Sequence, residues 1–239
     1  MIDKYKMKLE DNVFCAKRVL VDSVYKSANL EGIAVTFAET NDILNDVNVE
    51  KLKPSEISKV CCLRDGWQYI LQNISKPLDL GYMENLHELI AKGDLPHYDL
   101  GQIRVDGVLI SGTSWRPEIP NPDQLHVELH ELLKIPNDTE RAITIMLWMM
   151  RKQIFKDGNK RMATLVANKI LIEHGRGILS IPVELDGKFK EKLVHYYETN
   201  EMAELKNWIF EHCLDGTSYS EEYQELLEKE ETDEEKDDR

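Results

Sequence analysis

The chain has 239 residues, of which 42% are apolar, and its 44 acidic and 30 basic residues give a formal net charge of −14. These values are typical of a soluble globular protein with one domain, or with one domain and a small appendage, and they exclude a collagen-like or broadly disordered chain. A phosphate backbone would be repelled by this charge, so we expect no binding to nucleic acid.

No segment is apolar for long enough to cross a membrane. The best candidate, Ile143 to Met150, falls far short of the roughly 18 apolar residues that a membrane helix needs. The N-terminal residues are charged throughout and lack the apolar stretch of a signal peptide. We therefore expect no association with a membrane, and a cytoplasmic location.

The four cysteines agree with a reducing compartment. Cys61 and Cys62 are adjacent, Cys15 and Cys213 stand alone, and no C-x-x-C pair offers the spacing of metal ligands. A chain of this length buries its own core without a disulfide scaffold. Each cysteine is therefore most simply interpreted as a small apolar residue.

The C-terminal residues differ from the rest in charge. Residues 221–239 carry eleven acidic and three basic side chains, which is a net charge of −8 out of the total of −14. Such a concentration of like charge favours a solvated, disordered end of the chain.

Helical periodicity dominates the remaining sequence. Apolar residues at three- and four-residue steps predict one amphipathic helix from about Asn12 to Leu30. Thr36 and Glu39 have the spacing of a capping box that opens a short helix through Val47. Further helices are predicted from Pro54 onwards and over residues 80–92, 124–134, 138–153, 159–174, 183–199 and 201–212.

The segment Gly101–Trp115 has a different character. Two short stretches of alternating apolar residues flank Asp106 and Gly107, a dipeptide that strongly favours a two-residue hairpin turn. Prolines at positions 117, 120 and 122 close the segment. The sequence therefore predicts a mainly α-helical protein with one β-hairpin.

The most informative segment, QIFKDGNKRMAT, lies between two strongly apolar helices. Gly158 frees the backbone to turn, and Asn159 can cap the next helix, whose unpaired N–H groups form an anion site. Lys160 and Arg161 oppose the helix dipole in the first turn, which makes sense if a polyphosphate binds there and Asp157 holds a divalent metal. A plain turn and cap with both cations solvated is the alternative interpretation.

The same segment resembles the signature of the Fic/Doc family, H-x-F-x-D/E-G-N-x-R, with Gln153 at the position of the histidine. The stretch SANLEG, from Ser27 to Gly32, resembles the family's inhibitory-helix pattern, S/T-x-x-x-E-G/N. The predicted hairpin and its following prolines resemble the family's flap. Three separate features in the family's order, between Lys26 and Ile181, make the resemblance more specific than a single motif.

The resemblance implies an all-α fold, a Fic-type helical bundle with one β-hairpin flap. It also implies transfer of part of a nucleotide to a protein hydroxyl, usually AMP from ATP, with Asp157 holding Mg²⁺ on the phosphates. Phe155 would anchor the loop in the core. The phosphates would bind at Gly158, Asn159, Lys160 and Arg161, and the flap residues Val108, Leu109 and Ile110 would pair with an extended segment of a protein target.

Three positions depart from the family pattern. Gln153 replaces the catalytic histidine, and because an amide takes no proton from a hydroxyl at neutral pH, this loss costs on the order of 10²–10⁴-fold in rate. Lys160 replaces the glycine of members that transfer AMP and is similar to Doc-type members, which transfer the γ-phosphate. Thr164 replaces a second arginine that is the usual partner of the inhibitory glutamate.

Two classes of function therefore stay open. The chain is either a protein nucleotidyl- or phosphotransferase of reduced rate, or a nucleotide-binding pseudo-enzyme that acts by binding a partner. A homo-oligomer is compatible with the sequence in either case.

The inhibitory motif predicts a restraint on the phosphate site. Ser27 and Glu31 are four residues apart and so share one face of the first amphipathic helix. We expect the Glu31 carboxylate to pair with Arg161 or Lys160 and to occupy space that a γ-phosphate needs. The alternative is that Glu31 lies on the surface near a helix end and contributes almost nothing to the free energy of binding or folding.

The resemblance divides the chain into three parts. Residues 1–52 form an N-terminal helical region with the inhibitory motif, and residues 53–217 form the Fic core. Residues 218–239 form the acidic C-terminal tail.

Overall fold

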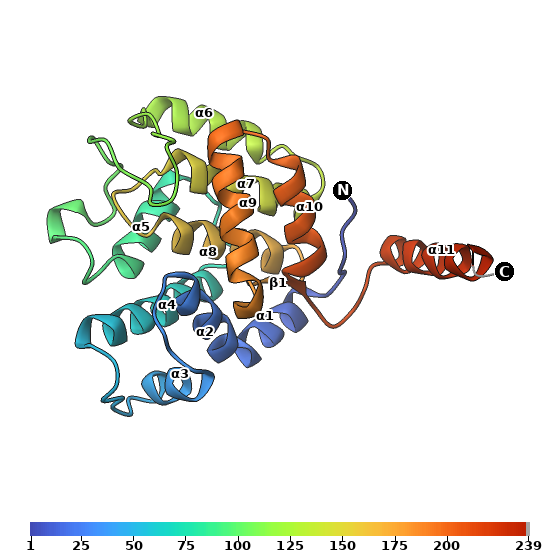
Figure 1. Ribbon diagram of the computed structural model, residues 1–239, viewed down its shortest axis with the longest axis horizontal. Coiled ribbons are helices and arrows are strands. Elements are labelled where there is room, and N and C mark those ends of the chain that lie inside the picture. Colours follow the sequence, from blue (N-terminus) through green and yellow to red (C-terminus); the bar gives the residue numbers. More distant parts are fainter. Residues whose placement is uncertain (238–239) are drawn as a thin grey trace.

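Figure 1 shows the computed structural model, which describes the backbone of residues 1–237 and the side chains up to residue 229. Helices make up most of this range, and its one sheet is the antiparallel pair of β1 (Ile178–Leu179) and β2 (Leu214–Asp215). The all-α fold class predicted from the sequence is confirmed. The α-helices are α1 (Leu9–Arg18), α2 (Leu20–Leu30), α3 (Phe37–Leu44), α4 (Pro54–Gln72), α5 (Leu80–Ile90), α6 (Pro122–Leu132), α7 (Asp138–Lys152), α8 (Asn159–Glu173), α9 (Asp186–Thr199), α10 (Ala203–His212) and α11 (Glu221–Asp237), and two 3₁₀ turns are η1 (His97–Asp99) and η2 (Val183–Leu185).

The two central helices, α7 and α8, form the core of the bundle. Eleven of the 15 residues of α7 and 13 of the 15 residues of α8 are buried, so both helices are covered nearly all round. Helices α1, α4 and α5 pack against α8, while α6 and α10 pack against α7. The short loop of residues 153–158 that joins the two helices is therefore held at the end of the most rigid part of the molecule.

Helix α4 comes unusually close to its neighbours at Gly66. A Cβ atom at this position would lie 2.7 Å from Ile90 Cγ2 on α5 and 2.7 Å from Leu165 Cδ1 on α8. A side chain at this position would therefore require the Ile90 and Leu165 side chains to shift, and Gly66 allows α4, α5 and α8 to pack closely.

The predicted single helix from Asn12 to Leu30 is wrong in one respect, because it is broken at Val19 (φ −97°, ψ 14°) into α1 and α2. Helix α1 packs against α8, whereas α2 packs against α3 and α4. One straight helix cannot follow both surfaces, and tertiary packing therefore overrides the continuous apolar pattern. The predicted capping box is confirmed, since Thr36 N–H donates to Glu39 Oε2 at 2.8 Å and Glu39 N–H donates to Thr36 Oγ1 at 3.2 Å.

The predicted β-hairpin is also wrong, since residues 101–115, named the flap segment below, contain no strand. A two-residue type I′ turn needs a positive φ at both central residues, and neither Asp106 nor Gly107 has one. The positive φ angles fall instead at Gly101 (70°) and Gly112 (83°). The flap segment therefore runs as an irregular arm whose ends, rather than its centre, make the turns.

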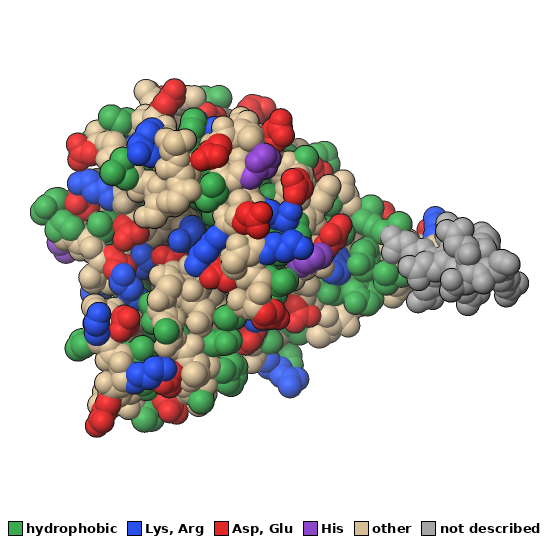
Figure 2. Space-filling view, in the orientation of Figure 1, with side chains coloured by type: hydrophobic (Ala, Val, Ile, Leu, Met, Phe, Trp, Pro, Cys, Tyr) green, Lys and Arg blue, Asp and Glu red, His purple; other side chains and the backbone are tan. Residues whose placement is uncertain are grey.

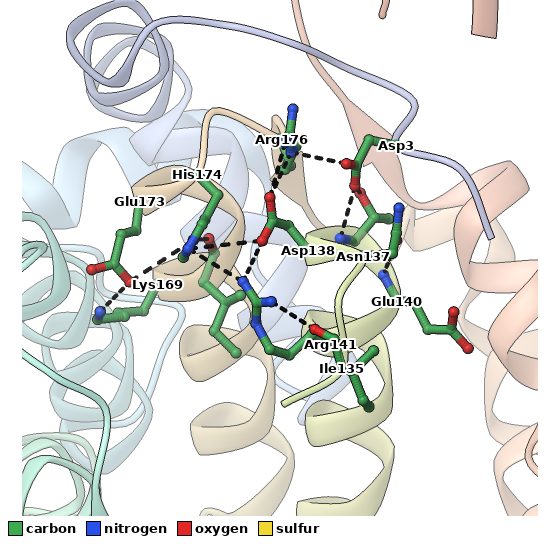
Figure 3. Close-up of polar contacts among 12 residues, drawn as sticks. Asp3, Ile135, Asn137, Asp138, Glu140, Arg141, Lys169, Glu173, His174 and Arg176 are labelled. Carbon is green, nitrogen blue, oxygen red and sulfur yellow. Dashed lines mark hydrogen bonds and ion pairs between the residues drawn. The ribbon is translucent and has the colours of Figure 1, made fainter. Parts of the chain in front are cut away.

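A polar network fastens the N-terminal residues to the start of α7 and the end of α8 (Figure 3). The Asp3 carboxylate accepts hydrogen bonds from the Thr139 N–H at 3.0 Å and from its hydroxyl at 2.7 Å. Arg176 bridges Asp3 and Asp138, with N···O distances of 3.2 and 2.9 Å, and Arg141 pairs with Asp138 as well. Helix α7 is thus fixed at the end opposite to the 153–158 loop.

The acidic end of the chain forms a helix that projects from the body (Figure 1). The expected disorder is wrong for residues 221–237, which form α11, and residues 238 and 239 lie outside the described part. Glutamate and leucine are good helix formers, which explains a helix despite the like charges. At the base of α11, the Tyr223 ring contacts the rings of Phe210 and Tyr219.

The surface carries mixed charges. On the face drawn in Figure 2, acidic and basic side chains are interspersed rather than gathered into patches of one sign. Among the residues that the structure describes, no helix combines the length and the apolar character needed to cross a lipid bilayer.

Candidate functional site

The loop between α7 and α8 is closed by two residues in the left-handed region. Gln153 (φ 50°) ends α7, and Gly158 (φ 75°) begins α8, as its predicted role in a turn requires. The predicted cap by Asn159 is wrong, because Gly158 holds the cap position and the Asn159 side chain turns back into the loop. No side chain caps α8, and its first N–H groups face the loop as an anion site would require.

Asn159 and Gln153 lock the shape of this loop. The Asn159 side chain accepts a hydrogen bond from the Phe155 N–H at 3.0 Å and donates to the Phe155 carbonyl at 2.8 Å and to Gln153 Oε1 at 3.1 Å. Gln153 Nε2 donates to the Met150 carbonyl at 2.6 Å. The Gln153 side chain is therefore occupied by internal hydrogen bonds at the position where the family signature has a base.

His87 of α5 packs against the 153–158 loop. Its ring stacks on Phe155 with centroids 3.9 Å apart, and both side chains are buried. Nδ1 accepts a hydrogen bond from the Gly101 N–H at 2.9 Å, which leaves Nε2–H to donate to the Asp157 carbonyl at 3.1 Å. Burial lowers the pKa of His87 to about 4, so the neutral ring joins α5, the flap segment and the loop at neutral pH.

Arg161 in the first turn of α8 is buried, with 3% of its side chain exposed. Its Nη1 donates to the Ile90 carbonyl at 2.8 Å and lies 2.8 Å from Asp94 Oδ2. The other edge of the guanidinium faces Glu31, with 3.6 Å between Nε and Oε2, and Asp157, with 3.7 Å between Nη2 and Oδ1. The Nε atom is buried and has no hydrogen-bond partner. A buried donor of this kind is costly unless a ligand or water satisfies it.

Glu31 follows the last residue of α2, and its carboxylate lies beside Lys160 and Arg161. Its Oε1 lies 3.4 Å from Lys160 Nζ, and this oxygen is buried without a hydrogen-bond partner. The structure thus brings together the residues of the inhibitory pattern and the two cations of the loop. The contacts are at ion-pair distance but longer than hydrogen bonds, which describes a loose pair rather than a closed one.

Asp157 is the candidate ligand for a metal ion. Its carboxylate is about half exposed, and Oδ1 accepts the Gly158 N–H at 2.6 Å, which leaves the second oxygen open. Mg²⁺ bound to phosphates commonly takes only one or two carboxylates from the protein and completes its shell with water. Asp157 and the buried, unsatisfied Nε donor of Arg161 therefore fit a magnesium–polyphosphate ligand, whereas the Glu31 carboxylate would repel its phosphates.

Arg104 joins the flap segment to the loop. This guanidinium is almost fully buried and donates to four main-chain carbonyls, those of Gln153, Asp106, Glu118 and Lys152. Its own N–H donates to the Ile154 carbonyl at 3.0 Å. No carboxylate contacts it among the described residues, and burial lowers its pKa. The flap segment is thus attached at its start.

The rest of the flap segment is open. From Val105 to Gly112, no backbone N–H donates to another backbone carbonyl of the described chain. Leu109 is 80% exposed, while Val108 and Ile110 are half-buried. Free N–H and C=O groups on an extended segment can pair with another strand.

A cavity of about 650 Å³ lies at the C-terminal end of α7, in the size range of small-ligand pockets, and no residue of the 153–158 loop lines it. The end of the flap segment, α6 and the C-terminal half of α7 line it, and Arg151 and Lys152 of its wall lead directly into Gln153. The Arg151 guanidinium stacks on the Trp115 ring at 3.8 Å, and Trp115 Nε1 is buried without a partner.

Sequence reasoning missed three residues of this site. Asp94, His87 and Arg104 lie far from the motif in the chain, and each acts through a contact that only the fold creates. The one available signal was that an arginine and a histidine stand in otherwise apolar or turn-forming surroundings, which is too common to select them.

Two buried central helices, joined by an Asp-Gly-Asn loop with cations at the start of the second helix, define a Fic-type fold. Residues 77–171 match the sequence model of the Fic/DOC family, so the family resemblance is confirmed across the segment that contains the loop. A comparison with curated protein sequences gives no match.

Solved structures share the fold. The chain is similar to Fic-1 (residues 134–508) from C. elegans, with a TM-score of 0.69 and 19% identity over 82% of this chain and 62% of that one. It is equally similar to a Fic domain containing signaling protein from Bacteroides thetaiotaomicron (0.69, 19%, covering 85% of each chain). A Fic family protein from Desulfovibrio desulfuricans gives 0.59 and 16%, over 81% of this chain and 61% of that one. The chain thus spans less than two thirds of the C. elegans and Desulfovibrio chains.

Proposed function

We propose that this chain binds ATP with Mg²⁺ at the start of α8 and that Glu31 restrains this binding. The observation that carries the proposal is the buried Arg161, whose Nε has no hydrogen-bond partner and faces the Glu31 carboxylate beside Lys160. Two cations at a helix N-terminus oppose the helix dipole, and an anion there removes the conflict.

The reaction that best fits this site is slow transfer of AMP to a protein hydroxyl. The hydroxyl oxygen would form a bond to the α-phosphorus as the bond to pyrophosphate breaks, and a base must accept the hydroxyl proton. The Gln153 amide cannot be this base, and its hydrogen bonds to Met150 and Asn159 give it a structural role instead. A nucleotide-binding pseudo-enzyme is therefore the competing function.

The target would be an extended protein segment paired with the flap. The N–H groups of residues 105–112, which donate to no other backbone carbonyl, and the exposed Leu109 support this part of the proposal. A cytoplasmic location and self-association remain predictions from the sequence.

Labelled ATP distinguishes these functions. Label transferred from α-labelled ATP to protein indicates AMP transfer. Transfer from γ-labelled ATP alone indicates a phosphotransferase, which the Lys160 ammonium beside Arg161 would favour. Binding without transfer indicates a pseudo-enzyme. Gln153→His is the companion variant, and we expect AMP transfer to rise by on the order of 10²-fold or more if only the base is missing.

Calorimetric titration with Mg-ATP tests the restraint. We expect Glu31→Gly to bind roughly ten- to a hundredfold more tightly than the parent, because the variant lacks a carboxylate that repels the phosphates and occupies space beside Lys160 and Arg161. Glu50→Gly removes an exposed glutamate near α4 and serves as the matched control, with unchanged affinity. Equal affinities for the parent and Glu31→Gly would contradict the restraint, and no binding by either would contradict the proposed function.

A further inference from the structure

Arg161 is surrounded by three carboxylates, and they do not hold it equally. Asp94 Oδ2 lies 2.8 Å from Nη1, whereas the nearest oxygens of Glu31 and Asp157 lie 3.6 and 3.7 Å from Nε and Nη2. The ion pair with Asp94 is therefore the closest of the three, although Asp94 Oδ2 accepts no hydrogen bond, and the contacts with the other two carboxylates are loose.

The Asp94 side chain is itself held by a second ion pair. Its side chain is 6% exposed, and its Oδ1 lies 2.7 Å from Lys59 Nζ on α4. The Ile90 carbonyl accepts from the same Nη1 of Arg161 at 2.8 Å. One edge of the guanidinium is thus clamped against the end of α5, and the opposite edge, Nε and Nη2, is turned toward the loop.

We infer that Asp94 is a positioning residue for Arg161, holding its inner edge so that the outer edge stays available to a phosphate and never closes fully onto Glu31. The inference rests on the proposed function, because it assumes that the outer edge binds phosphate. It explains why Arg161 Nε is buried without a hydrogen-bond partner although Glu31 Oε2 lies only 3.6 Å away. A guanidinium free to move would shorten this distance and give Nε a partner.

A simple alternative makes the opposite prediction. If Asp94 were only a negative charge near the site, its removal would strengthen the binding of an anion. If Asp94 positions Arg161, its removal releases the guanidinium toward Glu31 and weakens binding. The direction of the change in affinity therefore distinguishes the two roles.

The experiment is titration with Mg-ATP of Asp94→Ala in the parent and in the Glu31→Gly background. We expect about tenfold weaker binding in the Glu31→Gly background, where only orientation is lost, and a larger loss in the parent, where Arg161 also closes onto Glu31. Asp94→Asn keeps an acceptor for Nη1 and should recover part of the loss. Asp65→Ala, a half-exposed aspartate on α4, is the matched control and should bind as its parent does.

A measurement without ligand separates this inference from the proposed function. In ¹H–¹⁵N spectra of the free protein, we expect the Arg161 Nε–H signal to move in Asp94→Ala, because Nε gains a hydrogen bond to Glu31, and to stay in Asp65→Ala. If ATP does not bind to any variant, the proposed function is wrong and this signal alone decides the role of Asp94. An unmoved signal, or binding in Asp94→Ala that equals or exceeds that of its parent in both backgrounds, overturns the inference.

Discussion

The 153–158 loop and the flap segment are both irregular and meet at the start of α8, but they are held in different ways. In the loop, the side chains of Gln153 and Asn159 satisfy neighbouring groups, and the His87–Phe155 stack supports it from below. The flap segment is held mainly near its two ends, by Arg104 and by the stack of Trp115 on Arg151, and its central N–H groups donate to no other backbone carbonyl. The difference separates a part that must keep one geometry for a small anion from a part that can adapt to a protein chain.

The largest effect is expected where the two segments are joined. Arg104→Met leaves four partly buried carbonyls without this donor and should lower the free energy of unfolding by about 2–4 kcal/mol, measured by urea denaturation. Protease cleavage within residues 105–115 should rise as well. Arg116→Met is the control, because Arg116 is exposed and donates only to exposed carbonyls nearby. Equal stability of the two variants would mean that Arg104 does not hold the flap segment.

Acid should weaken the support of the loop. His87 has a pKa of about 4 in the folded chain and about 6.5 when unfolded, so the unfolded state binds more protons between these values. Stability therefore falls as the pH drops through this window, by about 3 kcal/mol from this residue. Unfolding titrations from pH 7 to 4 should show a steeper decline for the parent than for His87→Gln. Parallel curves would contradict the assignment.

A smaller loss is expected inside the loop. Asn159→Ala removes three hydrogen bonds to Phe155 and Gln153 and should cost about 2 kcal/mol of unfolding free energy. Asn207→Ala, on the exposed face of α10, should change stability by less than about 0.5 kcal/mol. If the two variants are equally stable, the loop is not held by its own side chains.

The smallest effect on stability is expected in the open part of the flap segment. Leu109→Ser should change the free energy of unfolding by less than about 0.5 kcal/mol, because the side chain is 80% exposed. Binding of a protein target, measured by pull-down with a purified target once labelled ATP has revealed it, should nevertheless weaken. A clear loss of stability would show that the flap segment is held along its length.

Local sequence patterns predicted the elements whose cause is local. Pro54 opens α4, Thr36 and Glu39 form the capping box, and Gly158 takes the positive φ that the turn needs. The same reasoning failed at Val19 and at Gly107, because packing on two different surfaces breaks the first helix and because Arg104 draws the flap segment onto the loop.

In the candidate site, the motif alone located the loop and its cations, and the inhibitory pattern singled out Glu31 as the carboxylate beside them. Asp94 could not be found in this way, because its pairing with Arg161 arises where the chain leaves α5 and passes α8. Contacts between residues nearly seventy positions apart leave no trace in local periodicity.

The absence of a side chain at Gly66 affects the residues that hold Arg161. Ile90, whose carbonyl accepts from Arg161, lies against the bare backbone of Gly66, and so does Leu165 of the same helix as Arg161. A methyl group at position 66 would have to displace the Ile90 and Leu165 side chains, which belong to the two helices that carry the carbonyl and the guanidinium. The position of the Arg161 guanidinium therefore depends partly on Gly66, a residue that does not contact it. Fewer sequences can keep this site than its polar residues alone suggest.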